Sequence, residues 1–196
     1  MSQILMDPGD KTRLQEFDPI FKAPLTIDIG HHEVHEGDSF LCGHSDISMA
    51  NTDTFVMAFK TPITKRVHLT YEIHTLAGCH VDIYKDSTWD ASSGSLLTVY
   101  NRFQNNFPDS SLVEEDQSTG SFIANDNMIL DPTTHVAGTR VMPSFYLFGN
   151  NQKGGGTRAM GEIILEQQTL HSVVLTADGA NNAGEVLLNW YEHTDG

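Results

Sequence analysis

The sequence predicts an all-β protein: an antiparallel sandwich of two β-sheets, expected to be a jelly roll, preceded by an extended N-terminal arm. Three observations indicate this class. Short stretches of alternating apolar and polar residues recur along the chain, as half-buried antiparallel strands require. Turn sequences rich in Gly, Asn, Asp and Ser separate these stretches. The chain has neither a long 3.6-residue period nor a regular alternation of strands with helices.

The arm is predicted for residues 1–29, ahead of a sandwich domain at residues 30–196. Three of the seven prolines, Pro8, Pro19 and Pro24, fall in the arm and prevent a long helix. Large apolar residues lie between these prolines. The alternative interpretation is a disordered tail, but such tails usually carry fewer large apolar residues. We therefore expect the arm to lie along another surface and to contact it through these residues: Leu14, Phe17, Ile20, Phe21, Leu25 and Ile27.

The strands of the predicted domain follow the arm, and roughly eight of them suit a two-sheet sandwich. Two short stretches, 110–117 and 161–169, are also compatible with a helix, and the second with a strand as well. The glycines at 154–156 have no strand–loop–helix frame around them and are expected in a mobile surface loop. The alternating stretches are residues 54–60, 66–76, 79–85, 95–103, 141–149, 169–177 and 184–193.

Residues 66–76 and 79–85 are predicted to form a hairpin, because only a short loop with Gly78 separates them. In the expected register, His74 lies opposite His80, and Glu72 lies opposite Asp82. Directly opposed side chains are about 5 Å apart at Cβ. The four residues would then share one polar face, which is either a wet strand surface or a weak ion site.

The stretch "HHEVHEGDSF" raises the question of a metal site, because His31, Glu33 and His35 would project from one face of a strand. Histidines with a carboxylate suit zinc, iron or manganese. Cupins, which are jelly rolls, use an H-x-H pair, but Glu33 and Val34 occupy the positions where its second histidine would lie. We expect polar strand residues and no bound metal, with His31, His35, His74 and His80 as the candidate ligands should one exist.

Charge and composition exclude several classes of function. The net charge of −15, from 26 acidic and 11 basic residues, opposes binding to nucleic acid. No run of eighteen apolar residues is present, so no membrane span is expected. The N-terminus lacks the pattern of a secretory signal, and Cys42 and Cys79 are expected to be reduced thiols. A zinc site using both cysteines is the alternative.

Catalytic and cofactor motifs are also missing from the sequence. It contains no G-x-S-x-G elbow, P-loop, dinucleotide fingerprint or H-E-x-x-H helix, so no cofactor is expected. Trp89 and Trp190 could belong either to a sugar-stacking platform or to the core of the sandwich, and the core is favoured.

Six stretches resemble tailed-phage structural proteins of the capsid-decoration (head-cement) kind, which are built on β-sandwiches. They are "IDIGHHEVHEGDSF", "DTFVMAFKTPITKRVHLTYEI", "GCHVDIYKDSTWD", "SSLVEEDQSTGSFIANDN", "VVLTADGANN" and "LLNWYEHTD". The resemblance runs from about Ile27 to the C-terminus and carries no active-site residues. It implies a non-enzymatic protein made in the host bacterial cytoplasm that binds the major capsid protein on the virion surface, expected as a homotrimer.

Two alternatives from other classes remain. One is a receptor- or glycan-binding module of a head or tail fibre, although the sequence shows no coiled-coil stalk for it. The other is a metal-dependent, cupin-like enzyme with the same jelly-roll architecture.

Overall fold

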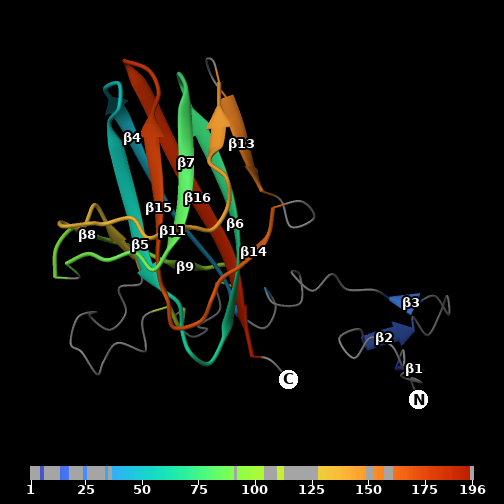
Figure 1. The fold of residues 1–196 in the computed structure, drawn as a ribbon. Helices are drawn as coiled ribbons and strands as arrows, with labels where there is room; N and C mark the ends of the chain where they lie inside the picture. The colour runs from blue at the N-terminus through green and yellow to red at the C-terminus, as the bar shows by residue number, and fades with distance from the viewer. Residues whose placement is uncertain are drawn as a thin grey trace.

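The computed structural model describes residues 5–6, 14–17, 24–25, 34, 37–90, 92–103, 110–112, 128–148, 152–156 and 161–194. Its named elements are the β-strands β1 to β16, and each strand pairing between them is antiparallel. Most of these strands form two sheets that pack face to face (Figure 1). The predicted all-β sandwich is confirmed.

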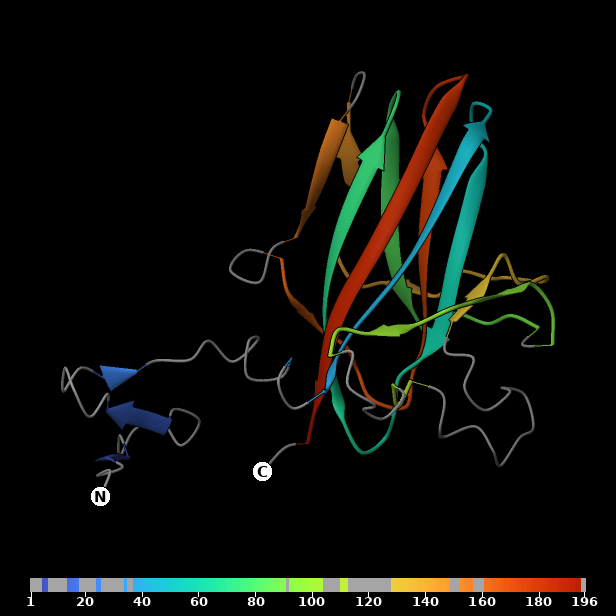
Figure 2. The same ribbon diagram turned by 180° about the vertical axis from the view of Figure 1, so that it is seen from behind.

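The first sheet, called the β16 sheet, is built around the longest strand of the chain, and Figure 2 shows it from its own side. Its strand order is β13 (Gln152–Gly156), β6 (Arg66–Thr75), β16 (Asn182–His193), β4 (Ser39–Met49) and β9 (Tyr100–Asn101), with β14 (Ile163–Ile164) also paired to β6.

The second sheet, called the β15 sheet, covers the other side of the core. Its strand order is β11 (Thr139–Arg140), β7 (Cys79–Lys85), β15 (Leu170–Ala177), β5 (Thr54–Lys60), β10 (Met128–Leu130) and β8 (Ser95–Leu97), with β12 (Phe145–Leu147) also paired to β7.

Several pairs of consecutive strands have one member in each sheet, and four of them are β4 with β5, β6 with β7, β12 with β13, and β15 with β16. The order β4–β16–β6–β13 in one sheet therefore matches the order β5–β15–β7–β12 in the other. The chain winds around the core as it passes repeatedly from one sheet to the other.

The core lies between the inner faces of the two sheets, and the alternation of the sequence determines which side chains enter it. In β6, Val67, Leu69, Tyr71 and Ile73 are buried, and the residues that alternate with them face outward. Trp190 of β16 is 2% exposed and its ring stacks on that of Phe40 at 5.8 Å. Trp190 is therefore a core residue, as favoured, rather than part of a sugar-stacking platform.

The predicted hairpin between residues 66–76 and 79–85 is wrong, because β6 and β7 lie in different sheets. The residues that connect them are held by Asn182, whose side chain is 1% exposed. Its Oδ1 accepts hydrogen bonds from Ala77 N (2.7 Å) and Thr75 Oγ1 (3.0 Å), and its Nδ2 donates to Gly78 O (2.7 Å). These bonds satisfy backbone groups of the link between the two sheets. In a hairpin, the backbone groups of the two strands would have paired with each other instead.

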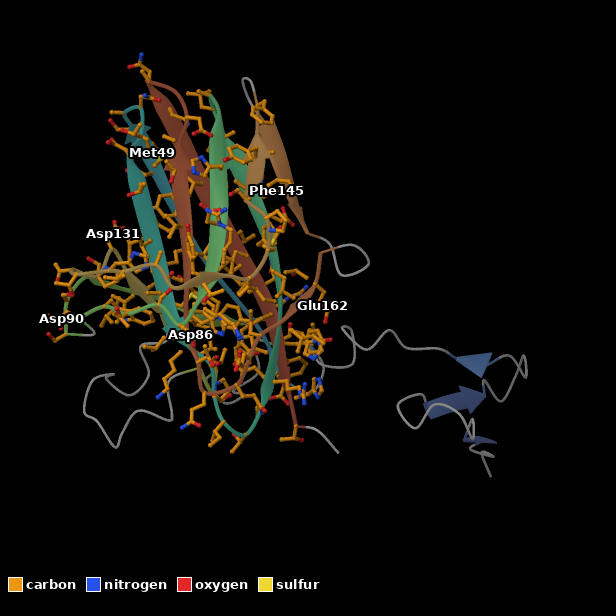
Figure 3. The ribbon with its side chains drawn as sticks, viewed as in Figure 1. Met49, Asp86, Asp90, Asp131, Phe145 and Glu162 are labelled. Carbon is orange, nitrogen blue, oxygen red and sulfur yellow. The ribbon has the colours of Figure 1, made fainter. Side chains whose placement is uncertain are left out.

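The glycines at 154–156 lie in β13 instead of the predicted surface loop. A Cβ built on Gly154 would come within 2.7 Å of Leu147 Cδ2 and 2.8 Å of the ring of Phe145, which is labelled in Figure 3. Only glycine lets β13 approach β12 this closely without displacing these side chains.

The stretch 95–103 also differs from its prediction, because it contains two strands in opposite sheets, β8 and β9. The helix-compatible stretch 110–117 is a turn at its described positions 111–112.

The arm contains three short strands, β1 (Leu5–Met6), β2 (Leu14–Phe17) and β3 (Pro24–Leu25). Their backbone is extended, as predicted, and they pair antiparallel with one another in the order β1–β2–β3. Among the described residues, the strands of this small sheet pair with no strand of the sandwich. Of the predicted arm contacts, Leu14, Phe17 and Leu25 lie in these strands, whereas Ile20, Phe21 and Ile27 fall outside the described residues.

Candidate functional site

Of the predicted metal-ligand candidates, the two that the structure describes, His74 and His80, lie on different sheets. His31 and His35 fall outside the described residues. His74 lies on the outer face of the β16 sheet, 3.7 Å from Glu72 Oε2 and 4.0 Å from Glu185 Oε2. His80 lies on the β15 sheet, where it is paired with Thr176 and Tyr146. Within the described ranges, no three His, Cys, Asp or Glu side chains are arranged to hold a metal ion.

A surface on the outer face of the β15 sheet brings together aromatic and polar side chains, and we call it the β12 surface. Strand β7 alternates, with Cys79, Val81 and Ile83 directed to the core and the residues between them to the outer face. The register places Tyr146 beside His80 and Arg140 beside Tyr84. The β12 surface consists of His80, Asp82, Tyr84, Arg140, Tyr146, Phe148 and Asp178.

Two aromatic rings dominate the β12 surface. Tyr146 and Phe148 are two residues apart in one extended segment, so their side chains project from the same face of the sheet. Their ring planes are parallel to within 3°, and the ring centroids are 5.6 Å apart. Tyr146 is 48% exposed and Phe148 78%. The ring of His80 lies on the other side of Tyr146, at 5.0 Å.

The polar side chains of the β12 surface are paired with one another. His80 Nδ1 lies 2.9 Å from Asp178 Oδ1, and Tyr84 Oη donates to Asp82 Oδ2 at 3.2 Å. Arg140 Nε is 3.0 Å from Asp82 Oδ1, within ion-pair distance but not aligned for a hydrogen bond, so this buried oxygen accepts none. A hydrogen bond with the Tyr84 hydroxyl and the charge of Asp82 raise the pKa of Arg140, which keeps its guanidinium charged.

A histidine cluster occupies the outer face of the β16 sheet, near Glu162, which is labelled in Figure 3. His193 Nε2 lies 2.8 Å from His68 Nε2, and His68 Nδ1 lies within hydrogen-bond distance of Glu162 Oε1. The Tyr191 hydroxyl donates to the same Glu162 oxygen at 2.7 Å. The sequence analysis missed this cluster because it depends on the pairing of β6 with β16.

A serine and a histidine also lie within hydrogen-bond distance, as they do in some hydrolases. His135 Nε2 is 3.0 Å from Ser172 Oγ, and Ser172 Oγ is 2.8 Å from Ser87 Oγ. Both serines are 0% exposed, so no substrate can reach either hydroxyl in this structure. Burial lowers the pKa of His135, which favours its neutral form. This trio joins β7, β15 and the segment before β11, and we interpret it as structural.

Lowering the pH should destabilise the protein through His171, which is 1% exposed and stacks on Phe59 at 5.7 Å. Burial lowers its pKa from the ordinary 6.5, so below that pH the unfolded chain binds a proton that the folded chain refuses. The free energy of unfolding should therefore fall as the pH drops below 6.5, by up to about 1.4 kcal/mol per pH unit. Urea unfolding of the wild type and of His171→Phe across this range measures the slope, which should be shallower in the variant.

The matched control is Phe59→Leu, which removes the stacking partner of His171 and leaves the titrating ring in place. It should lower stability at every pH and keep the slope of the wild type. Equal slopes in the wild type and in His171→Phe would show that another group causes the acid sensitivity.

Chelation should leave the protein unchanged, because no ligand would be lost from the native state if the histidines are polar strand residues. We expect the melting temperature to be the same with and without EDTA. A large decrease that one specific ion reverses would contradict this prediction. His31, His35, His74 and His80 would then be the first positions to replace.

Comparisons with known proteins give no match: no family model, no curated protein and no solved structure matches this chain. Among the residues the structure describes, no helix has the length and apolar character needed to cross a membrane.

Proposed function

We propose that this chain is a non-enzymatic phage structural protein that binds the outer surface of the assembled capsid and stabilises it. The observation that carries the proposal is the matched order of the eight principal strands, β4–β16–β6–β13 facing β5–β15–β7–β12. We infer that this winding is a jelly roll, an eight-stranded double sheet found in viral capsid and lectin domains. The resemblance of the sequence to capsid-decoration proteins supports the same class.

The N-terminal arm supports attachment in this proposal. Its strands β1, β2 and β3 pair with one another and with no strand of the sandwich. The sandwich thus completes its two sheets without the arm, whose apolar residues can serve a different surface. Attachment through several arms at once gains from effective concentration, since each further contact becomes intramolecular.

A homotrimer is the expected assembly in this proposal, because cyclic symmetry repeats one surface patch around an axis and the three-fold positions of a capsid would match it. Light scattering should therefore give a mass about three times that of the 21.7 kDa chain. A monomer mass at every concentration would contradict the trimer and leave capsid binding to be tested separately.

The direct test is co-sedimentation of the purified protein with phage heads that lack it. The protein should pellet with the heads and saturate at a fixed number of copies per capsid. Binding should survive moderate salt, because its main contribution is apolar burial rather than exposed ion pairs. A protein that stays in the supernatant with intact heads at all concentrations would refute the proposal.

A further inference from the structure

The β12 surface exposes apolar rings to solvent at a place where they do not contribute to the core of the sandwich. Leu147, between Tyr146 and Phe148, already fills the inner side of the strand and is 8% exposed. The two rings point outward, with about half of Tyr146 and most of Phe148 accessible. The two rings are parallel with their centroids 5.6 Å apart, so together they form one apolar patch.

The polar groups beside this patch are held in place by contacts with one another. Asp178 is paired with His80 and Asp82 with Arg140, so each carboxylate has a cationic or ionisable partner. Asp82 is only 6% exposed, yet its Oδ1 accepts no hydrogen bond. An unmatched buried acceptor is costly and is satisfied when a ligand supplies a donor. Arg140, whose side chain is 47% exposed, is the group that lies against this oxygen and has room to move.

We propose that the β12 surface binds a neutral hexose or N-acetylhexosamine unit of a glycan. A pyranose ring has an apolar C–H face that packs on an aromatic ring and equatorial hydroxyl groups that both donate and accept hydrogen bonds. Parallel aromatic rings beside fixed carboxylate, guanidinium and imidazole groups match both properties, as ligand sites with mainly aromatic walls and a few fixed polar groups do. Tyr146 and Phe148 supply the stacking, and Asp82, Arg140 and His80 supply the hydrogen bonds.

Other partners fit this surface less well. Nucleic acid also stacks on aromatic rings, but it needs clustered basic residues, and the chain carries a net charge of −15. A cationic peptide could pack on the rings through cation–π contacts. However, the guanidinium of Arg140 lies on this surface, 3.0 Å from Asp82 Oδ1, and its positive charge opposes the approach of a cationic peptide.

The experiment uses the purified full-length chain without capsids, so its outcome does not depend on the proposed capsid binding. Saturation-transfer NMR and calorimetry are run with three neutral oligosaccharides, maltohexaose, cellohexaose and tri-N-acetylchitotriose, and with trilysine as the cationic probe. At least one oligosaccharide should bind, and trilysine should not. Phe148→Ala and Tyr146→Ala should each weaken binding about tenfold or more, as expected when one stacking contact is lost.

Ile47→Ala is the matched control, because Ile47 is 85% exposed and lies on β4 of the other sheet. It should bind the oligosaccharide as the wild type does, and thermal melting should show that all three variants are folded. The proposal is overturned if none of the three oligosaccharides binds at millimolar concentration. It is equally overturned if Phe148→Ala and Tyr146→Ala bind the sugar unchanged, or if trilysine alone binds.

Discussion

Replacing Glu192 by alanine is expected to lower the free energy of unfolding by about 3–5 kcal/mol, the largest effect of a single substitution that we predict. Glu192 is 0% exposed and lies on the inner face of β16, two residues after the core residue Trp190. Its carboxylate accepts hydrogen bonds from Ser111 N (3.0 Å), Trp190 Nε1 (3.0 Å) and the hydroxyls of Ser110 and Ser111.

The large cost follows from what the substitution leaves behind. Alanine removes the acceptor but not the buried donors, and each unsatisfied donor costs about 1–3 kcal/mol. The hydrogen bonds also attach the segment 110–112, whose Leu112 is 3% exposed in the core, to the last strand. Loss of the carboxylate should therefore release this segment and open part of the core to water.

Urea unfolding at neutral pH measures the effect, and Glu192→Gln and Glu185→Ala are the comparison variants. Glutamine keeps the shape of the side chain and one acceptor oxygen, so it should cost less than alanine. Glu185 lies on the same strand but is exposed, and its replacement should change stability by less than about 0.5 kcal/mol. A Glu192→Ala protein as stable as Glu185→Ala would show that the carboxylate is not needed.

The sandwich class was predictable because it depends on local alternation. Val67, Leu69 and Ile73 have the period of a half-buried strand whatever their partners are, and they do enter the core. The same alternation places Glu192 on the inner face of β16, after Leu188 and Trp190. The buried position of this carboxylate is therefore visible in the sequence pattern.

The partner of each strand was not predictable in the same way. A short link such as residues 76–78 serves equally well for a hairpin and for a crossover between sheets. The crossover is favoured here by Asn182, which is 107 residues away from Thr75 in the sequence. Non-local contacts of this kind also create the histidine cluster and the β12 surface, because Tyr146 meets His80 only through the pairing of β12 with β7. The candidate site therefore required the structure, although Tyr146 and Phe148 are visible in the sequence as an alternating aromatic pair.

Deleting residues 1–25 is expected to abolish most binding to phage heads while leaving the sandwich folded. In the part of the chain that the structure describes, the deleted strands β1 to β3 pair with one another and not with the sandwich. The two sheets should therefore keep their hydrogen bonds, and the melting temperature should be nearly unchanged. Each large apolar side chain that the arm buries on a capsid contributes about 1.5–3 kcal/mol, offset by about 1–2 kcal/mol for each backbone residue that becomes ordered. The net gain of one arm is small, and it becomes decisive only when several arms of an oligomer bind together.

Replacing Phe17, Ile20 and Phe21 by serine should reproduce much of the deletion in the co-sedimentation assay, because it removes the apolar contacts and keeps the chain length. The matched control replaces three exposed apolar residues of the sandwich, Ile47, Ile63 and Leu96, by serine. Each triple variant replaces three large apolar side chains by serine, so a difference in head binding should come from where those side chains lie. If the truncated protein fails to fold, the arm contributes to the stability of the sandwich. If it decorates heads at full occupancy, attachment lies on the sandwich and the proposed role of the arm is wrong.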